Sequence, residues 1–454
     1  MLSDVFNLRD DAERIWRAGV AAVSPARLIR ENVLVDGNYL FIGDETIDLK
    51  TIRRIAIVGA GKAAGAMAVA LEAALGPRLI AEKELTGWVN VPADCVVVME
   101  RVHLHAARPA GVNEPRPEGL AGTRRILELV SSLGSADVCI CLLSGGGSAL
   151  LTAPVPGLSL DDKIRATRLL SAAGANIEQL NTVRRQLSLV KSGGLARTCR
   201  AGRLITLLIS DVLGDSLEAI ASGPTVEGST SPADALAVLS VLRIQNEPDI
   251  SPIVDYLSKR SAIIKEHPLT SHISNLILAN NATAVDAAGV EAERLGYSHA
   301  MISATKPEEA AETVGRHLAG MALHMRREDG PDCLISGGEP TVTLIDEVTR
   351  GKGGRNQQLA LAALTAVGDC NGIAILSAGT DGEDGPTDAA GAIVTEQVVR
   401  ESLRQNLDPY EFLRRNDAYS FFDRAGEHFK TGPTHTNVCD IRVVVVDRES
   451  RDQF

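Results

Sequence analysis

Aromatic side chains are scarce in this sequence. Phe, Trp and Tyr together make up 3% of its 454 residues, whereas 45% of all residues are hydrophobic. Leu, Ile, Val and Ala must therefore fill the core, and a chain of this length has enough of them for two or three domains. Glycine is abundant, with 41 residues, and much of it clusters directly after apolar runs. That pattern is typical of α/β proteins whose ligands bind at loops.

An excess of positive charge is also lacking. The chain has 46 Lys and Arg residues against 58 Asp and Glu residues, which gives a net charge of −12. Binding to nucleic acid without sequence preference requires a basic surface, so we expect no nucleic-acid partner. Small anionic ligands are not excluded, because a locally basic cleft binds them whatever the overall charge.

Paired cysteines, a signal peptide and a long apolar run are missing as well. The seven cysteines include no CxxC pair, which favours reduced thiols and a cytoplasmic protein. The N-terminal stretch MLSDVFNLRDDAERIW is too charged for the apolar region of a signal peptide. No apolar run approaches the roughly 20 residues of a membrane helix, so we expect no membrane partner.

The order of predicted elements indicates a parallel sheet with helices on both faces. A helix is predicted at 10–23 and a hairpin at 32–42, and β/α alternation begins after them. In the alternating region we predict strands at 54–58, 86–91, 96–102, 138–143 and 203–209, a helix from Lys62, and helices at 117–133, 161–173 and 177–190.

A second α/β run follows a stretch rich in turn residues at 226–272. In this run we predict strands at 274–279, 332–336, 341–346, 373–377 and 441–446, and helices at 282–295, 307–326 and 355–367. We place the domain boundary in the turn-rich stretch, so that residues 1–270 form one domain and residues 271–454 form the other.

Lys62 lies in the first glycine-rich loop, Val58–Gly65, which follows a predicted strand. Ala63 stands where a Walker loop has Ser or Thr, so the loop is not a P-loop. Gly65 comes one residue late for the dinucleotide fingerprint. A lysine in the first helical turn opposes the helix dipole unless an anion also binds there. Lys62 is therefore either an anion-binding residue or an ordinary surface lysine.

The second loop, Ser144-Gly145-Gly146-Gly147-Ser148, follows the apolar strand VCICLL. Three consecutive glycines cost conformational entropy, but they let backbone amides approach a ligand closely. A nest of such amides binds phosphate, so the loop predicts a phosphate site. The alternative is a plain tight turn.

Basic residues gather near residue 190. Arg184, Ser188 and Lys191 fall on one face of the predicted helix 177–190. This face either points toward a polyphosphate or is the ordinary basic end of a helix.

Charged residues also follow the strands of both halves. Asp211 comes after the strand LITLLI and is either a general base, a Mg²⁺ ligand or a helix N-cap. Arg355 opens a helix after a glycine-rich loop, where a guanidinium suits bidentate contact with carboxylate or phosphate. Asp381 and Asp384 lie in an acidic loop without EF-hand spacing. They either serve a Mg²⁺-nucleotide site or belong to a solvated loop, and His435 is left open as a site residue.

Taken together, these loops resemble one family, the class II glycerate kinases. The resemblance runs from about Ile55 to the C-terminus, in the blocks LLSGGGSALL, LNTVRRQLSLVKSGGLA, LISDVLGDSLEAIASGPTV, SGGEPTVTL, GKGGRNQQLALAAL, LSAGTDGEDGPTDAAGA and GPTHTNVCDI. It implies a Rossmann-like α/β/α sandwich with a parallel sheet, followed by a smaller α/β domain with a mixed sheet, known as MOFRL. It also implies transfer of the γ-phosphate of ATP to the 2-hydroxyl of D-glycerate, with Mg²⁺.

The resemblance also implies roles for particular residues. Lys62, Asp211 and Arg355 match positions proposed as catalytic in that family. To nucleotide binding we assign Ser144, Gly145, Gly146, Gly147, Ser148, Lys191, Asp381 and Asp384, and to Mg²⁺ binding Asp211 and Asp381. The chain departs from the family between His103 and Glu118, where members often read close to GHPVPD. That segment bears on which hydroxy acid is the acceptor.

Two rival functions compete with the kinase. A hydroxypyruvate reductase is supported by the imperfect glycine-rich turn at 59–65, but the acidic ribose contact roughly 20 residues further on is missing. A non-catalytic sugar-acid-binding protein would not need so many glycine-rich loops beside clustered carboxylates. We therefore expect a kinase whose partner is a small hydroxy acid, and we leave a homodimer open.

Overall fold

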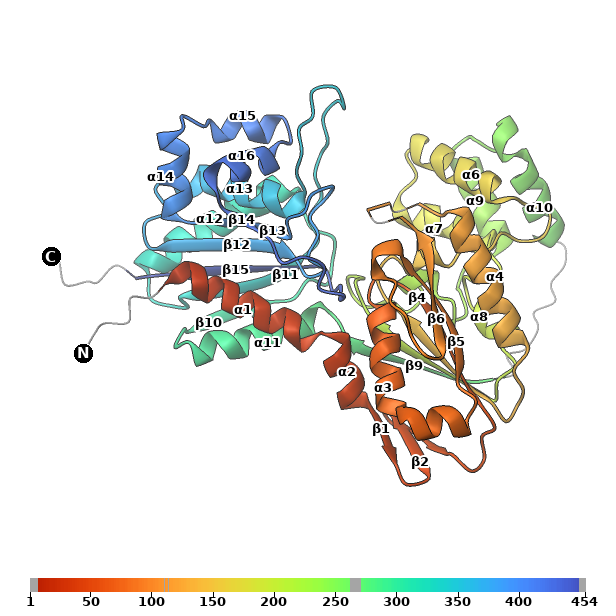
Figure 1. Cartoon of the computed structure of the whole chain (residues 1–454). Coiled ribbons are helices and arrows are strands. Elements are labelled where there is room, and N and C mark those ends of the chain that lie inside the picture. Colours follow the sequence, from red (N-terminus) through yellow and green to blue (C-terminus); the bar gives the residue numbers. More distant parts are fainter. Residues whose placement is uncertain (1–6, 110, 113, 262–270, 449–454) are drawn as a thin grey trace. The chain divides into compact units, whose positions relative to one another are not determined.

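The chain folds into two compact units, neither of which is contiguous in sequence (Figure 1). This computed structural model describes residues 7–109, 111–112, 114–261 and 271–448. Unit 1 comprises Met1–Arg27, Ser210–Asp215 and Ala279–Phe454, and unit 2 comprises Leu28–Ile209 and Ser216–Leu278. The predicted boundary at 270/271 adjoins residues 262–270, which lie outside the described residues, so that boundary stays a prediction.

Unit 2 is built on a six-stranded sheet in the order β6-β5-β4-β7-β8-β9. Its strands are β4 (Ile55–Ala60), β5 (Thr86–Pro92), β6 (Val102–Arg108), β7 (Val138–Leu143), β8 (Arg203–Ile209) and β9 (His272–Ala279). The pairs β4–β5, β4–β7, β5–β6 and β7–β8 are all parallel. Every residue of β4 and β7 is buried, which explains why these strands are continuous apolar runs. The predicted parallel sheet is confirmed.

Helices cover both faces of this sheet. In α3 (Ala64–Glu82), Gly65 lies against Val91 and Leu104, whereas in α4 (Pro117–Ser131) Gly122 lies against Asn90 and His105. Successive strand residues point to opposite faces, so α3 and α4 pack on opposite sides. This arrangement is the predicted α/β/α sandwich.

Helix α3 is long and apolar enough, by length and composition, to cross a membrane. The expectation that no apolar run has this length was therefore wrong. A single helix of this kind is weak evidence for a membrane span, because core helices pass the same test. In α3 the backbone breaks at Gly76 (φ 74°) before Pro77, and residues along its length, such as Met67 and Leu71, are buried. It is a core helix of unit 2.

The rest of unit 2 lies around the sheet. A small antiparallel sheet contains β1 (Val33–Asp36), β2 (Tyr39–Ile42) and β3 (Glu45–Asp48), next to α2 (Pro25–Asn32), which confirms the predicted hairpin. The other helices are α5 (Gly147–Leu150), α6 (Leu160–Ala172), α7 (Ile177–Gln186), α8 (Gly194–Thr198), α9 (Pro232–Val241) and α10 (Ser251–Ser261). Leu170, Val183, Leu239 and Leu257 join α6, α7, α9 and α10 in one apolar cluster.

Unit 1 is built on a mixed sheet in the order β10-β11-β15-β12-β13-β14. Its strands are β10 (His299–Ile302), β11 (Cys333–Gly338), β12 (Ile373–Gly379), β13 (Gly391–Val394), β14 (His428–Phe429) and β15 (Asp440–Val446). The pair β10–β11 is parallel, and the four remaining pairs are antiparallel. The predicted mixed sheet is therefore confirmed.

Helices also cover both faces of the mixed sheet (Figure 1). One face carries α1 (Leu8–Ala22) and α11 (Asn281–Arg294), and the other carries α12 (Ala311–Arg327), α13 (Arg355–Val367), α14 (Glu396–Arg404), α15 (Pro409–Arg414) and α16 (Ala418–Ala425). Trp16 of α1 donates from Nε1 to the Ala378 carbonyl oxygen at 3.3 Å, and its ring meets the ring of Phe429 edge-on. The buried indole thus fixes the N-terminal helix to unit 1.

Three predicted elements were wrong. Residues 96–101 form no strand, and the strand follows at Val102–Arg108; Val98 is fully exposed. Helix α7 ends at Gln186 rather than at 190, because Ser188 forms a bridge with Pro154. No strand forms at 341–346, where Thr341 makes a single bridge to Ala310. At Ser188 and Thr341 a tertiary bridge overrides the local pattern, whereas the valines at 96–98 are exposed and pair with no strand.

Candidate active site

The first two glycine-rich loops meet in unit 2. They follow the neighbouring strands β4 and β7. From β4 the chain adds strands toward one edge of the sheet, and from β7 it adds strands toward the other edge. This is the switch point at which doubly wound sheets bind ligands. The Lys62 amide donates to the Gly145 carbonyl at 2.9 Å, and the Ser144 hydroxyl accepts from the Ala63 amide at 2.9 Å.

Glycine is required where these loops touch. A Cβ atom on Gly61 would lie 2.1 Å from Ser144 Oγ. Gly146 has a φ of 79°, and a Cβ there would lie 3.3 Å from Arg108 Nη2 and 3.8 Å from Lys62 Cγ. Two cationic side chains, Arg108 and Lys62, therefore flank Gly146. Backbone amides and flanking cations are the groups that hold phosphate.

Arg108 was missed by the sequence analysis. It is 4% exposed, lies at the end of β6, and donates from Nη1 to the Val112 carbonyl. It belongs to the 103–118 segment, of which residues 110 and 113 lie outside the described residues. A cation at the carboxyl end of a parallel strand is a signal for anion binding. The predicted strand 96–102 concealed it, because the strand in the structure, β6, ends at Arg108.

Lys191 joins the same loop from another direction. Its Nζ donates to the hydroxyls of Ser148 and Ser222, and these two hydroxyls are themselves 2.9 Å apart. Lys191 is 2% exposed, and burial, reinforced by the charge of Arg184, holds its pKa well below the ordinary value. The predicted placement of Arg184, Ser188 and Lys191 on one helix face was wrong, because α7 ends at Gln186.

In unit 1, Arg355 begins α13 and binds two carboxylates. Its Nε and Nη2 donate to Asp440 at 2.7 and 2.9 Å, and its Nη1 donates to Glu339 at 3.0 Å. Burial lowers the pKa of Arg355, but the nearby Asp440 and Glu339 outweigh it and raise that pKa above its ordinary value. Burial raises the pKa of Glu339. No sequence pattern identifies Asp440 or Glu339 as partners of Arg355, since their contact with it depends on the tertiary fold.

Asp384 lies at the N-terminus of α13. Its carboxylate accepts from the amides of Asn356 and Gln357 at 3.0 and 2.8 Å, and it is 2% exposed. Burial raises the pKa of Asp384 to about 7, against the opposing effect of these amide hydrogen bonds. These contacts fix the start of the helix that carries Arg355. The assignment of Asp384 to nucleotide binding stays a prediction.

Asp211 and Asp381 both lie in unit 1, in contact with the loop before β15. Asp211 Oδ2 accepts from Asn437 Nδ2 at 3.2 Å, and the Asp211 carbonyl accepts from Cys439 Sγ at 3.0 Å. Asp381 Oδ1 accepts from the Glu383 amide, and the Asp381 carbonyl accepts from the Thr434 amide, at 3.1 Å each. His435, with a φ of 60°, is an exposed residue of the same loop.

Asp211 and Asp381 are the candidate ligands of a Mg²⁺ ion. Within the described ranges, no three His, Cys, Asp or Glu side chains are grouped so as to hold a metal ion. Mg²⁺ in kinases needs only one or two carboxylates, because water and phosphate oxygens complete its octahedron. Asp211 and Asp381 therefore fit a Mg²⁺ ion that arrives with a nucleotide, and their role as ligands stays a prediction.

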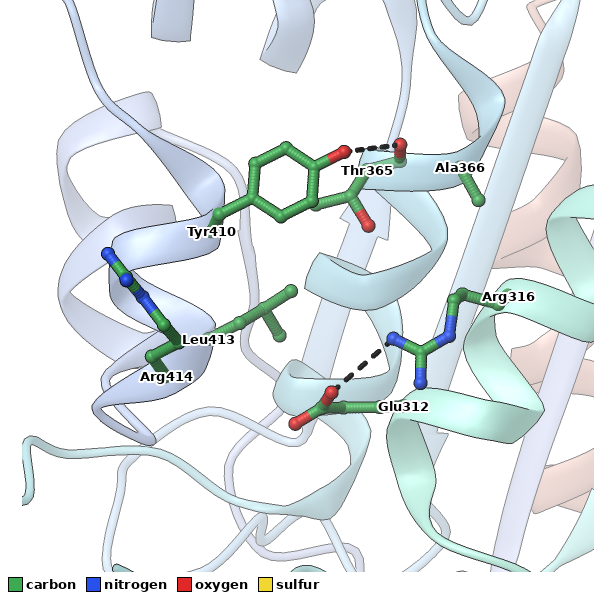
Figure 2. Close-up of a pocket in the computed structure, with 7 residues that line it drawn as sticks. All are labelled: Glu312, Arg316, Thr365, Ala366, Tyr410, Leu413 and Arg414. Atoms are coloured by element: carbon green, nitrogen blue, oxygen red, sulfur yellow. Dashed lines mark hydrogen bonds and ion pairs between the residues drawn. The ribbon is translucent and has the colours of Figure 1, made fainter.

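A cavity of about 510 Å³ in unit 1 contains none of the predicted site residues (Figure 2). It is lined by Glu312, Arg316, Thr365, Ala366, Tyr410, Leu413 and Arg414. Arg316 forms an ion pair with Glu312 at 3.4 Å, and the Tyr410 hydroxyl donates to the Thr365 carbonyl. Its polar groups are largely paired within the chain.

The fold and these loops define an α/β protein whose glycine-rich turns lie at a sheet switch point beside buried cations. Residues 11–255 match the family described as a domain of unknown function, DUF4147, and residues 332–440 match the MOFRL family. The D-glycerate 2-kinase of Thermotoga maritima is 35% identical, over 98% of this chain and 99% of its own length.

Two further similar proteins also match most of this chain. The crystal structure of a Thermotoga maritima glycerate kinase superimposes with a TM-score of 0.80 at 33% identity, over 97% of this chain and 99% of that chain. A protein of Agrobacterium vitis with the provisional name hydroxypyruvate reductase is 36% identical, over 87% of each chain. The chain belongs to the glycerate kinase family with an N-terminal DUF4147 domain and a C-terminal MOFRL domain. The resemblance found in the sequence is thereby confirmed.

Proposed function

We propose that this chain transfers the γ-phosphoryl group of ATP to the 2-hydroxyl of D-glycerate, giving 2-phosphoglycerate. The observation that carries the proposal is the meeting of Lys62, Arg108 and Lys191 at the glycine-rich loop of unit 2. Phosphoryl transfer depends mainly on positioning and on neutralising charge, and these groups provide both. The near-full-length similarity to the D-glycerate 2-kinase supports the acceptor and the position of transfer.

In this proposal unit 2 holds the nucleotide phosphates. The amides of Gly145, Gly146 and Ser148 contact phosphate oxygens, since those of Ser144 and Gly147 donate to the Ala60 and Ser144 carbonyls. Lys191 fixes Ser148 through a hydrogen bond to its hydroxyl. Lys62 neutralises charge on the transferring group as it leaves the nucleotide. Arg108, on the other side of Gly146, adds a second positive charge.

For residues of unit 1 we propose the roles that the family resemblance implies. Arg355, held by Asp440, contributes positive charge for an anionic substrate group. Asp211 orients the 2-hydroxyl and accepts its proton, as a carboxylate in hydrogen-bond reach of an attacking hydroxyl does in kinases. Mg²⁺, held by Asp381, would screen the negative charge of the phosphates, and Asp211 is its second ligand in the alternative in which it does not act as the base.

The reductase reading keeps one supporting observation, the provisional name of the Agrobacterium vitis relative. The site geometry favours the kinase. A Rossmann dinucleotide site needs a carboxylate at the end of the second strand for the ribose, and here that strand, β5, ends in Asn90, Val91 and Pro92. The first carboxylate beyond β5 in the sequence, Asp94, lies in the following 3-10 turn and is exposed.

A coupled assay tests the proposal. Purified protein is mixed with ATP, Mg²⁺ and D-glycerate, and product is followed by enolase, with NADPH or NADH and hydroxypyruvate in a parallel well. Product that enolase consumes without phosphoglycerate mutase establishes a 2-kinase. Product that requires the mutase places the phosphate on the 3-hydroxyl, and NAD(P)H oxidation without ATP use favours the reductase.

We further propose that the enzyme acts in the cytoplasm, since all seven cysteines are free thiols. A homodimer stays a prediction, which light scattering on the purified chain tests.

A further inference from the structure

A second group of cations lies behind the glycine-rich loop of unit 2. Lys163 of α6 is 7% exposed, and its Nζ has no hydrogen-bond partner. Arg184 near the end of α7 is partly exposed, and Lys191 follows beyond that helix. Helices α6 and α7, which carry Lys163 and Arg184, pack against each other through Leu170 and Val183. The charges of Lys163 and Arg184 also act on Lys191 and lower its pKa.

Carboxylates near this group are bound to other cations. Arg185 pairs with Glu218 at 3.4 Å, and Arg165 pairs with Asp162 and more distantly with Asp249. Among the described residues, no carboxylate lies within ion-pair distance of Lys163, Arg184 or Lys191. The charged groups facing Lys163 are thus Arg184 and Lys191, and both are positive.

Such an arrangement is costly in the absence of a ligand. Buried charges in proteins are normally paired, and an uncompensated one shifts its pKa toward the neutral form. Burial, with the charge of Arg184, accordingly lowers the pKa of Lys163 to about 7. A bound oxyanion would restore the charged form and would satisfy the orphaned Nζ. Arg184 is partly exposed.

We propose that Lys163, Arg184 and Lys191 form a buried oxyanion-binding site, connected to the glycine-rich loop through the hydrogen bonds of Lys191 to Ser148 and Ser222. Lys163 is its new binding residue. The inference rests on the proposed function for the identity of the ligand. Two parts of that reaction carry an oxyanion, the carboxylate of the hydroxy acid and the phosphates of the nucleotide.

Calorimetric titration separates the two sources. D-glycerate alone and β,γ-methylene-ATP alone are titrated into the wild type, Lys163→Met and the matched control Lys259→Met. Lys259 is an exposed lysine near the end of α10, so its variant should bind both ligands as the wild type does. Lys163→Met should weaken one ligand about ten- to a hundredfold, as loss of a charge-assisted hydrogen bond does. Weaker D-glycerate binding identifies the carboxylate, and weaker binding of the analogue identifies the phosphates.

Proton uptake is a second readout. Titration of the wild type near pH 8, about one unit above the pKa of Lys163, in buffers of different ionisation enthalpy should show proton uptake when the oxyanion binds. Lys163→Met should reduce the uptake, since only Lys191 then remains to gain a proton, and Lys259→Met should preserve it. Unchanged affinities in Lys163→Met, or binding of both ligands by the wild type without proton uptake, would overturn the proposal.

Failure of this inference and failure of the proposed function give different results. If the wild type phosphorylates D-glycerate while Lys163→Met binds both ligands normally, the inference fails and the kinase stands. If the wild type makes no product but Lys163→Met still weakens binding of the nucleotide analogue, the kinase proposal fails and the oxyanion site stands.

Discussion

Asp440 holds Arg355 through two parallel hydrogen bonds, Nε to Oδ2 at 2.7 Å and Nη2 to Oδ1 at 2.9 Å. Asp440 is fully buried at the start of β15, and Arg355 begins α13. A bidentate pair fixes the plane of the guanidinium as well as its position. Asp440 is therefore a positioning residue, and the orientation of Arg355 depends on a strand distant in sequence.

The substitution Asp440→Asn should impair both stability and turnover. It removes the main counter-charge of a guanidinium whose side chain is 34% exposed. Because solvent screens part of the loss, the cost should lie between that of an exposed and that of a buried pair, at about 1–3 kcal/mol. Turnover at saturating substrate should fall more than tenfold. Glu339→Gln is the matched control, because Glu339 is 44% exposed and an exposed pair contributes about 1 kcal/mol or less. Thermal unfolding and kcat are measured for both; a wild-type melting temperature and kcat in Asp440→Asn would contradict the positioning role.

Lys62→Ala should lower kcat by orders of magnitude while the fold is retained. Lys62 is partly exposed beside Gly146, so its truncation opens little of the core. Its charge is proposed to act on the transferring phosphoryl group, where positive charge contributes most in the transition state. Circular dichroism and the coupled assay give the two quantities, with Lys259→Ala as the surface control. Near-normal turnover would remove Lys62 from the chemistry.

Gly146→Ala should raise the KM for ATP, whereas its loss of stability should be no larger than that of a glycine variant away from the loop. The left-handed φ of 79° strains any residue with a Cβ, at about 1–2 kcal/mol, and this Cβ would also press on Arg108. Gly157→Ala is the matched control, because Gly157 has a φ of 91° and no atom within 4 Å of the added Cβ. Both variants should lose similar stability, but only Gly146→Ala should lose affinity for ATP. Equal KM values would show that the loop does not contact the nucleotide.

Much of the fold could be predicted from periodicity alone. The strands 138–143 and 203–209 and the helix 355–367 have the bounds predicted from the sequence. Their apolar runs are long, and glycine or polar residues limit them clearly. Errors arose where a short run was ambiguous, as at Val96-Val97-Val98, which lies exposed outside the sheet. The displaced strand then concealed Arg108.

The candidate site was less predictable than the fold. Lys62, Lys191 and Arg355 were found because each lies beside glycines in the sequence. Asp440 reads as the first residue of a buried strand, and Lys163 as one charge of an amphipathic helix. Their importance depends on what lies opposite them, and no local pattern in a single sequence records such contacts.

The pH dependence of stability provides a last prediction, on Lys163→Met. The pKa of Lys163 is about 7 in the folded chain, against an ordinary value of 10.5. At pH values between these two, Lys163 is mostly protonated in the unfolded chain and mostly neutral in the folded chain. Stability of the wild type should therefore rise as pH increases from about 7 toward 10, and below pH 7 the full cost of the buried charge is present.

Methionine has similar length and carries no charge, so it removes this cost. The free Lys163→Met protein should be more stable than the wild type below pH 7, and the difference should shrink as pH rises toward 10. Lys259→Met should follow the wild-type profile throughout. Denaturant unfolding at a series of pH values measures the difference. A variant that is less stable than the wild type at every pH would mean that Lys163 has a stabilising partner within the folded chain, and that no ligand is needed to compensate its charge.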